Sequence, residues 1–145
     1  MVRTSFALAV CAVIGVGAIT WAQHEEHGAA KRKLISRKDI AEKLDGKQCQ
    51  ASTVEVSLEP GVGSAPHRHP GPVFGYVLEG TYEWAIDDNP GRILKAGDTF
   101  YEPTGTLHRV SRNPAKTGRT RVLAVLLHPH DAREIVIPEK GASKR

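Results

Sequence analysis

The sequence contains little cysteine. Only two of its 145 residues are cysteines, Cys11 and Cys49, and Cys11 lies in an apolar segment near the N-terminus. Removal of that segment would leave Cys49 alone, which excludes an internal disulfide framework and requires a core that is stable without one. Cys49 is expected to be a small buried residue, with a free thiol as the alternative.

Aromatic residues are also scarce, at 6% of the chain. The formal net charge is +4, and the Lys and Arg residues are scattered in small clusters. A nucleic-acid-binding surface needs a basic stripe interleaved with aromatic side chains, so no nucleic-acid partner is expected. The sequence also has no nucleophile elbow, no phosphate-binding glycine loop and no Cys-x-x-Cys pair, and Ser-His-Asp catalysis has no local support.

One long apolar run is present, at residues 6–19, after Arg3 and before the small residues Thr20 and Ala22. This order is typical of a secretory signal peptide, so residues 1–22 are predicted to direct export to the periplasm or the exterior. The run is shorter than the ~20 residues that a membrane-spanning helix needs. No stable membrane span is therefore expected after cleavage, and an uncleaved anchor is the alternative.

The remainder divides into three parts. Residues 23–49 are expected to form an N-terminal arm, residues 50–138 a single barrel domain, and residues 139–145 a flexible tail. Within the arm, widely spaced apolar residues suit a short helix or an irregular segment that closes over one end of the core; these residues are Leu34, Ile35, Ile40 and Leu44.

From residue 50 onward the apolar pattern changes to a period of two. Residues 53–58 alternate polar with apolar side chains, as a half-buried strand does. Residues 121–127 contain a continuous apolar run, which is typical of a strand covered on both faces. Further short strands are expected at residues 73–78, 81–86, 92–95, 99–102, 106–111 and 134–138. Short strands separated by turn signals predict an all-β sandwich or barrel.

A His-x-His pair lies between two of the expected strands. In an extended chain alternate side chains share a face, so His67 and His69 point the same way and can bind one metal ion together. Pro66 and Pro70 flank the pair, and because proline cannot donate to a sheet ladder, the pair belongs at a strand end. His108 is the candidate third imidazole. The alternative is a pair of surface histidines in a polar turn.

Several other side chains have expected places. His128 and His130 repeat the His-x-His spacing, but the proline between them favours a loop over a second metal site. Aromatic side chains on the expected strands are assigned to the core or the pocket wall; these are Tyr76, Trp84 and Phe100.

Two stretches of the chain resemble the paired motifs of a known family. One runs from Gly61 through the His-x-His pair to Gly80 and is similar to the first cupin motif. The other runs from Gly97 to His108 and is similar to the second motif, with Asn113 one position later than the usual asparagine. The chain therefore resembles a small single-domain cupin. The fold that this implies is all-β, a double-stranded β-helix or jelly-roll barrel, here with a short N-terminal helical or irregular arm.

The resemblance implies a divalent transition metal, Fe, Zn, Cu, Ni or Mn, held by the neutral imidazoles of His67, His69 and His108. Cupins commonly add a glutamate four residues after the second histidine, and that position here is Val73. Because Val73 shares the strand parity of His69, it is expected to face the site without bringing a donor atom.

Another carboxylate could replace the missing ligand, and Glu102, Glu83 and Glu79 are the candidates. Tyr101 and Glu102 lie on opposite faces of a regular strand, so only one of them faces inward. An inward Tyr101 would orient a substrate. An inward Glu102 would act as a general base or an outer ligand, and an exposed Glu102 in a rim loop is the alternative.

The function expected from these residues is that of a metal-dependent cupin enzyme, oxygenase-like, acting on a small organic molecule. Two alternatives remain: a binding module that holds a metal or small ligand without chemistry, and a structural protein with leftover histidines. A homodimer that covers exposed edge strands is also expected.

Overall fold

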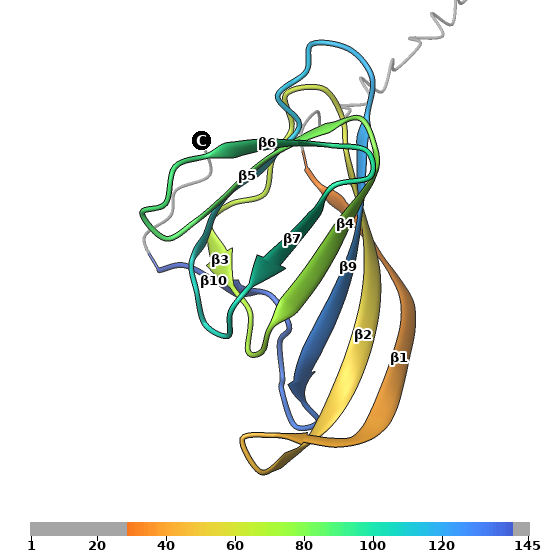
Figure 1. Cartoon of the computed structure of the whole chain (residues 1–145), viewed down its shortest axis with the longest axis vertical. Coiled ribbons are helices and arrows are strands. Elements are labelled where there is room, and N and C mark those ends of the chain that lie inside the picture. The colour runs from red at the N-terminus through yellow and green to blue at the C-terminus, as the bar shows by residue number, and fades with distance from the viewer. Residues whose placement is uncertain (1–28, 141–145) are drawn as a thin grey trace, which may run out of the picture.

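Two five-stranded antiparallel sheets make up the computed structural model, which describes residues 29–140 (Figure 1). Sheet A contains, in spatial order, β1 (Lys31–Leu44), β2 (Lys47–Leu58), β9 (Thr120–Pro129), β4 (Val73–Glu79) and β7 (Thr99–Glu102). Sheet B contains β10 (Ile137–Pro138), β3 (His67–Arg68), β8 (His108–Arg112), β5 (Thr81–Ile86) and β6 (Arg92–Lys95). The described residues contain no helix, which confirms the predicted all-β class.

The chain passes repeatedly from one sheet to the other. From β2 onward, β3, β5, β6, β8 and β10 belong to sheet B, and the intervening strands belong to sheet A. Segments far apart in the sequence are therefore neighbours: β3 pairs with β8, and His67 lies opposite His108 in that pairing. This order of strands brings together the residues of the two histidine-containing stretches.

The arm expected at residues 23–49 differs from the prediction, because residues 31–44 form a strand and not a helix or an irregular segment. β1 pairs with β2 over most of its length, and Leu44 lies opposite Lys47. Asp45 and Gly46 form the two-residue turn with positive φ values of 49° and 76°, which suits the twist of a β-hairpin. Pairing satisfies the backbone groups of the β2 edge, and this tertiary gain overrides the weak local pattern of β1.

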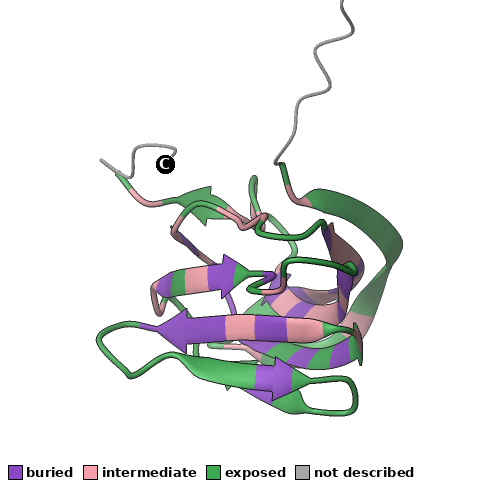
Figure 2. Ribbon diagram, turned by 90° about the horizontal axis from the view of Figure 1, so that it is seen from above, coloured by how far each residue is buried: buried purple, intermediate pink, exposed green. Residues whose placement is uncertain are grey.

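The core lies between the two sheets, and buried residues alternate with exposed ones along the strands (Figure 2). A cluster of buried apolar side chains fills one end, and includes Leu58, Val77, Tyr82, Trp84, Ile86, Leu94, Phe100 and Val122. Trp84 and Phe100 are thus where the sequence predicts them. Cys49 is buried, also as predicted. Tyr76 is not in the core: it has the opposite strand parity to Val77 and is exposed on the outer face of sheet A.

Gly75 has no side chain, and this makes room for the ring of Phe100. Gly75 on β4 lies opposite Phe100 on β7, and both positions face the interior. A Cβ atom at Gly75 would lie 2.0 Å from Cζ of the Phe100 ring, far inside van der Waals contact. The absence of a side chain at this position allows the aromatic ring to pack across the strand and against Trp84, whose ring centroid is 5.6 Å away.

Asn113, the residue at the end of the second motif, is fully buried and stabilises loops. Its side-chain amide donates to the carbonyl oxygens of Leu58 at 3.2 Å and Gly118 at 2.8 Å, and its Oδ1 accepts from the backbone N–H of Ala115 at 3.0 Å. Its role in this chain is therefore to join the end of β2 to the loop before β9.

The sequence predicted a signal peptide at the N-terminus, a flexible tail at the C-terminus and no stable membrane span after cleavage. The predicted signal peptide, residues 1–22, lies outside the described residues, as does most of the predicted tail. Glu139, the first residue of that tail, is anchored: its carboxylate pairs with Arg68 at 2.8 Å, and its backbone N–H donates to Pro66. Among residues 29–140, no helix is long and apolar enough to cross a membrane.

Substitution of Gly75 by alanine tests the packing of Phe100. We expect Gly75→Ala to lower the free energy of unfolding by about 1–3 kcal/mol, because the added methyl group must displace the ring. Chemical denaturation measures the change. Gly91→Ala is the matched control, since a Cβ atom there meets nothing closer than Glu83 Oε1 at 3.8 Å. Equal stability of the two variants would contradict the packing described.

Candidate metal centre

The three histidines that the sequence singled out meet inside the barrel. His67 lies on β3, His69 follows it by two residues, and His108 begins β8. Each residue offers a ring nitrogen, and the three nitrogens all lie within 4.8 Å of one another. All three side chains are buried. The alternative of surface histidines in a polar turn is therefore wrong, and the three residues form one cluster.

Backbone carbonyl groups orient two of the three imidazoles. His67 Nδ1 lies 2.8 Å from the carbonyl oxygen of Ala65, and His69 Nδ1 lies 2.6 Å from that of Ile135. Since a carbonyl oxygen can only accept, both Nδ1 atoms carry hydrogen and donate, which leaves the lone pair on Nε2. Hydrogen bonds of this kind fix the tautomer of metal-binding histidines.

Burial keeps the imidazoles neutral. It lowers the pKa of His67 to about 4, and it is also the main cause that lowers the pKa of His69. The pKa of His108 lies well below its usual value, first because of burial and then because of the two neighbouring histidines. Neutral imidazoles have a free lone pair at neutral pH, so the cluster is in the protonation state that binding to a cation requires.

Glu102 brings a carboxylate to the cluster. On β7, Glu102 lies directly opposite Val73 of β4, and both side chains are buried on the inner face. Val73 faces the site, as its strand parity predicts. The carboxylate therefore enters the site from the strand adjacent to the position where the cupin motif has its glutamate.

One oxygen of this carboxylate has no partner. Oε1 accepts from Trp84 Nε1 at 3.1 Å and lies 3.1 Å from His108 Nδ1. Oε2 lies 3.6 Å from His69 Nε2, is buried, and has no hydrogen bond. Burial raises the pKa of Glu102 to about 7, against the smaller opposing effect of the Trp84 hydrogen bond. A buried oxygen without a donor, 3.6 Å from one ring of a cluster of three neutral imidazoles, fits a bound cation.

Other carboxylates and Tyr101 lie away from the cluster. Tyr101 is 50% exposed on the outer face of sheet A, where its ring lies 5.2 Å from that of Phe74. This placement corrects the alternative in which Tyr101 faces inward, since the buried neighbour Glu102 occupies the inner position. Glu83 pairs with Arg112, and Glu79 pairs with Arg119, both at the surface.

Tyr82 and Ser111 extend the polar network, and neither residue was among those predicted for the site from the sequence. Tyr82 Oη donates to Ser111 Oγ at 2.8 Å and lies 3.3 Å from His108 Nε2. Their positions could have been found, because Tyr82 shares the strand parity of the buried Trp84, and Ser111 faces Trp84 across the β5–β8 pair.

The second His-x-His stretch does not form a cluster. His128 is buried, where Nδ1 donates to the Pro129 carbonyl and Nε2 accepts from Ser52 Oγ at 2.9 Å. His130 is exposed and lies 3.7 Å from Asp39. Within residues 29–140, the three histidines described above are the only His, Cys, Asp or Glu group close enough to hold a metal ion.

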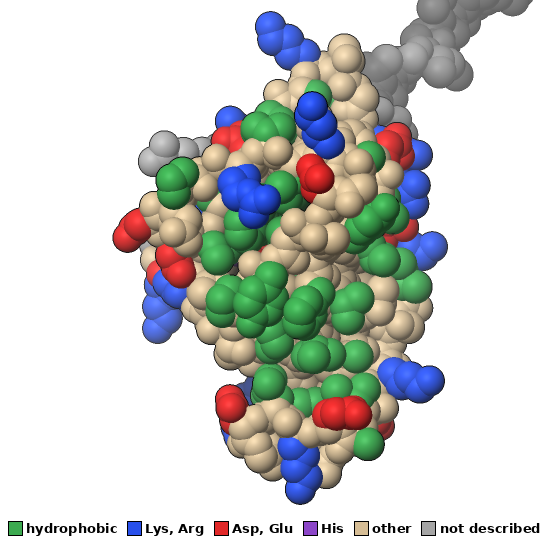
Figure 3. Space-filling view, in the orientation of Figure 1, with side chains coloured by type: hydrophobic (Ala, Val, Ile, Leu, Met, Phe, Trp, Pro, Cys, Tyr) green, Lys and Arg blue, Asp and Glu red, His purple; other side chains and the backbone are tan. Residues whose placement is uncertain are grey.

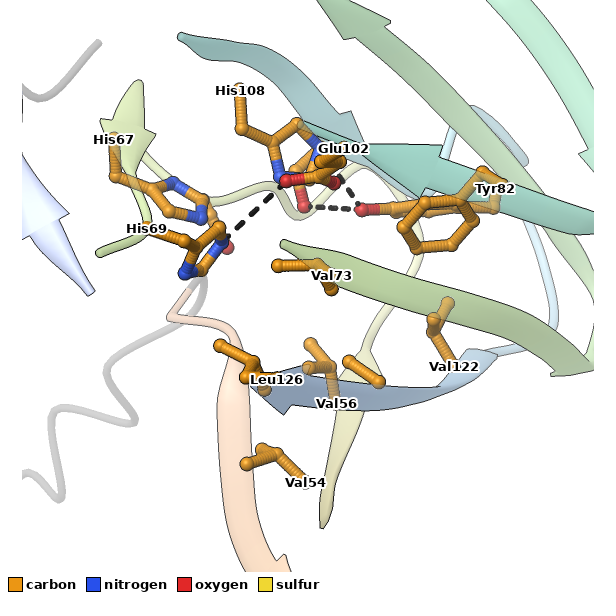
Figure 4. A pocket seen from close by; sticks show the side chains of 14 residues that line it. Val54, Val56, His67, His69, Val73, Tyr82, Glu102, His108, Val122 and Leu126 are labelled. Atoms are coloured by element: carbon orange, nitrogen blue, oxygen red, sulfur yellow. Dashed lines mark hydrogen bonds and ion pairs between the residues drawn. The ribbon is translucent and has the colours of Figure 1, made fainter. Parts of the chain in front are cut away.

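A pocket with a volume of about 50 Å³ adjoins the cluster. Figure 4 shows His67, His69, His108 and Glu102 on one side and a row of aliphatic side chains on the other. The aliphatic side chains are Val54, Val56, Val73, Val122, Ala124 and Leu126. The pocket thus places polar, electron-pair-bearing groups opposite an apolar wall.

Fold and site together define a β-barrel protein with a buried cluster of three histidines and one glutamate. A family model described as a cupin domain matches residues 54–126, which is half of the chain. The chain belongs to the cupin family. No match is found among curated proteins.

Solved structures share this fold. An uncharacterised conserved protein with a double-stranded β-helix domain from Klebsiella pneumoniae is 21% identical, over 78% of this chain and 88% of that chain, with a TM-score of 0.59. The DMSP lyase DddQ from Ruegeria pomeroyi is 18% identical over 75% of this chain, with a TM-score of 0.54. An oxalate oxidase is 24% identical over 61% of this chain, with a TM-score of 0.52. These similarities confirm the predicted double-stranded β-helix. This chain spans 53% of the lyase and 45% of the oxidase.

Replacement of Glu102 by glutamine tests the unpaired carboxylate. In the unfolded chain a glutamate ionises near pH 4.5, whereas in the folded metal-free protein Glu102 ionises near pH 7. The raised pKa favours the fold below pH 4.5, and this contribution is lost as the pH rises to 7. Relative to the original protein, the Glu102→Gln variant should therefore gain up to about 3 kcal/mol between pH 4.5 and pH 7.

Denaturation of both metal-free proteins across this pH range measures the difference. The lowered pKa of His67 makes the free energy of unfolding change with pH in the opposite direction, but this effect cancels because both proteins retain His67. Glu59→Gln is the control, because Glu59 is exposed in the turn after β2. A difference between the Glu102→Gln variant and the original protein that does not change with pH would contradict the description of this site.

Proposed function

We propose that this chain is a metal-dependent cupin enzyme that acts on a small organic molecule by oxygenase-type chemistry. The observation that carries the proposal is the cluster itself: three neutral imidazoles with nitrogens within 4.8 Å of one another, beside a buried carboxylate oxygen without a hydrogen-bond partner. His67, His69 and His108 would hold the ion, and Glu102 would supply the carboxylate.

The donor set supports a transition metal, with Fe, Zn, Cu, Ni and Mn as candidates. Imidazole suits Zn, Cu, Fe and Ni, and carboxylate suits Mn, while histidines combined with a carboxylate are typical of non-haem iron oxygenases. Val73 stands at the position where cupins commonly have a glutamate ligand, and Glu102 provides a carboxylate from the neighbouring strand. A bound ion would act as a Lewis acid or redox centre toward the substrate.

The chain's own residues have separate parts in this proposal. The Ala65 and Ile135 carbonyls fix the imidazole tautomers, and Trp84 holds one oxygen of Glu102. With its pKa near 7, Glu102 can hold or release a proton at neutral pH when Oε2 is not engaged by a cation. The aliphatic wall excludes water from the opposite side of the pocket. The solved cupin enzymes with the same fold add support for catalysis over simple binding.

Export is part of the same proposal. Residues 1–22 have the order of segments that a signal peptide has, and we propose that they direct the protein to the periplasm or the exterior before cleavage. The single remaining cysteine, Cys49, is buried, so the proposed exported form presents no exposed thiol among the residues that the structure describes.

Metal analysis of protein purified without a histidine tag tests the centre. We expect about one transition-metal ion per chain, and loss of at least nine-tenths of it in His108→Ala, because a three-imidazole site loses one of its ligands. His130→Ala is the matched control and should retain the metal, since His130 is exposed and lies outside the cluster.

An unchanged metal content in His108→Ala would overturn the proposed centre. Oxygen-uptake assays of the metal-loaded protein against phenols, diketones and thiols then separate an enzyme from a binding module. Retention of metal without turnover of any of these classes would favour the binding module over the oxygenase.

We also propose that a second copy of the chain covers the outer face of sheet A. An apolar patch on this face, visible in Figure 3, is formed by side chains that are 37–50% exposed: Phe74, Tyr76, Leu78 and Tyr101. Contiguous exposed patches of this kind mark interaction surfaces. Two sheet faces can pack against each other through their apolar side chains, and the ion pairs of Arg121 with Glu55 and Glu79 leave charges paired on the same face.

A charged residue within the patch tests this dimer. Phe74→Lys should convert a dimer to a monomer in sedimentation-velocity experiments over a concentration series, because it buries an unpaired charge in the interface. Ile93→Lys is the control, since Ile93 is an equally exposed apolar residue on β6 of sheet B. A monomeric original protein, or loss of the dimer only in the control, would contradict the proposal.

A further inference from the structure

Arg32 lies next to the pocket, although it precedes the matched cupin domain. It is on β1, opposite Val56 of β2 in the antiparallel pairing. Val56 lines the pocket. Residues directly opposite each other in a sheet point to the same face, with Cβ atoms about 5 Å apart. The side chain of Arg32 therefore leaves β1 on the face that looks into the barrel.

Ser64 fixes the far end of this side chain. Arg32 Nη2 donates to Ser64 Oγ at 2.9 Å, and Ser64 itself lines the pocket. The position of Ser64 is set by its backbone N–H, which donates to the carbonyl of Ser111 at 2.8 Å. The guanidinium group thus reaches from the Val56 side of the pocket to its Ser64 side. Because Arg32 is exposed, this group stands at the rim and not in the interior.

The positive charge of Arg32 acts on the pKa of all three histidines. Burial is the main reason for the lowered pKa of His67, His69 and His108, and the positive charge of Arg32 is a further, smaller cause at each of them. The other arginine close to this end, Arg68, pairs with Glu139 and donates to the Gly105 carbonyl. Arg32 is therefore a fixed positive charge beside the histidines.

The pocket restricts what can occupy it. A volume of about 50 Å³ accepts roughly three to five water-sized groups. One wall is aliphatic, so a short hydrocarbon segment fits against it, and the rim carries a guanidinium group that has five N–H donors in a planar fork. Guanidinium groups bind carboxylates through two parallel hydrogen bonds.

We propose that Arg32 is a specificity-determining residue that binds the carboxylate of a small organic acid, while the short aliphatic part of that acid lies in the pocket beside the histidine cluster. This inference rests on the proposed function, because it takes the pocket as the substrate site. It assigns the selection of the substrate to β1, a strand outside residues 54–126 that match the cupin domain.

Titration calorimetry with two matched probes tests the role of Arg32. Butyrate and butyramide have the same aliphatic part and differ in the charge of the head group. The original protein, loaded with Zn²⁺, should bind butyrate more tightly than butyramide. Arg32→Gln should weaken butyrate binding by about 10- to 100-fold, the usual loss for a charged hydrogen bond, and leave butyramide unchanged. Arg32→Lys retains the charge without the planar fork and should lie between the two.

Arg37→Gln is the matched control. Arg37 also lies on β1 and also donates to a serine hydroxyl, that of Ser52 at 3.3 Å, but Ser52 does not line the pocket. Its substitution should leave butyrate binding unchanged. Equal butyrate affinity in the original protein and Arg32→Gln, or no preference for butyrate over butyramide, would overturn the inference.

Measurement of the metal content shows whether a failure concerns the role of Arg32 or the proposed metal centre. The Arg32→Gln variant should retain the metal of the original protein, because Arg32 is not among the ligands. Protein that lacks metal but binds butyrate through Arg32 would contradict the proposed centre alone. Protein that holds metal but shows no effect of Arg32→Gln on butyrate binding would contradict the present inference alone.

Discussion

The contact between the buried carboxylate of Glu102 and the neutral imidazoles is the interaction on which the site depends. Burial of an ionised group without a partner costs several kcal/mol, and Oε2 of Glu102 has none. The histidines cannot compensate by becoming charged, since burial lowers the pKa of His67 to about 4. The protein keeps two kinds of electron-pair donor together in one buried cluster, and a cation satisfies both. The folded structure holds this arrangement at a cost that only a bound ion or a proton on Glu102 relieves.

The pairing of strands explains how the barrel holds these groups. β3 and β8 bring His67 opposite His108, and β4 and β7 bring Val73 opposite Glu102. Opposite residues in a sheet share a face. A carboxylate can therefore be provided from either of the two paired positions, Val73 or Glu102, and still face the site. The fold therefore constrains where a donor atom lies in space and leaves open which strand provides it. The same reasoning applies to β1, which adds Arg32 to the rim from outside the matched domain.

Local patterns in the sequence were enough for most of the barrel. Alternation, apolar runs and turn residues predicted every strand of the two sheets except β1 and β3, and the two motif-like stretches identified the histidines. The prediction for the N-terminal arm was wrong because β1 has few buried residues of its own and is stabilised by its pairing with β2. This is a tertiary effect that no local sequence pattern shows. For Tyr101 and Glu102, strand parity reduced the choice to two, and only the packing against Trp84 and His108 shows which one faces inward. Arg32 could not be recognised, because its proximity to Ser64 depends on contacts between residues 32 positions apart.

Anomalous X-ray diffraction from crystals of untagged protein, measured on both sides of the absorption edge of the metal, tests the central claim most directly. The account predicts one anomalous peak per chain, within bonding distance of a ring nitrogen of each of His67, His69 and His108 and of an oxygen of Glu102. A peak elsewhere, or no peak in crystals grown with Fe²⁺, Mn²⁺ or Zn²⁺, would contradict it.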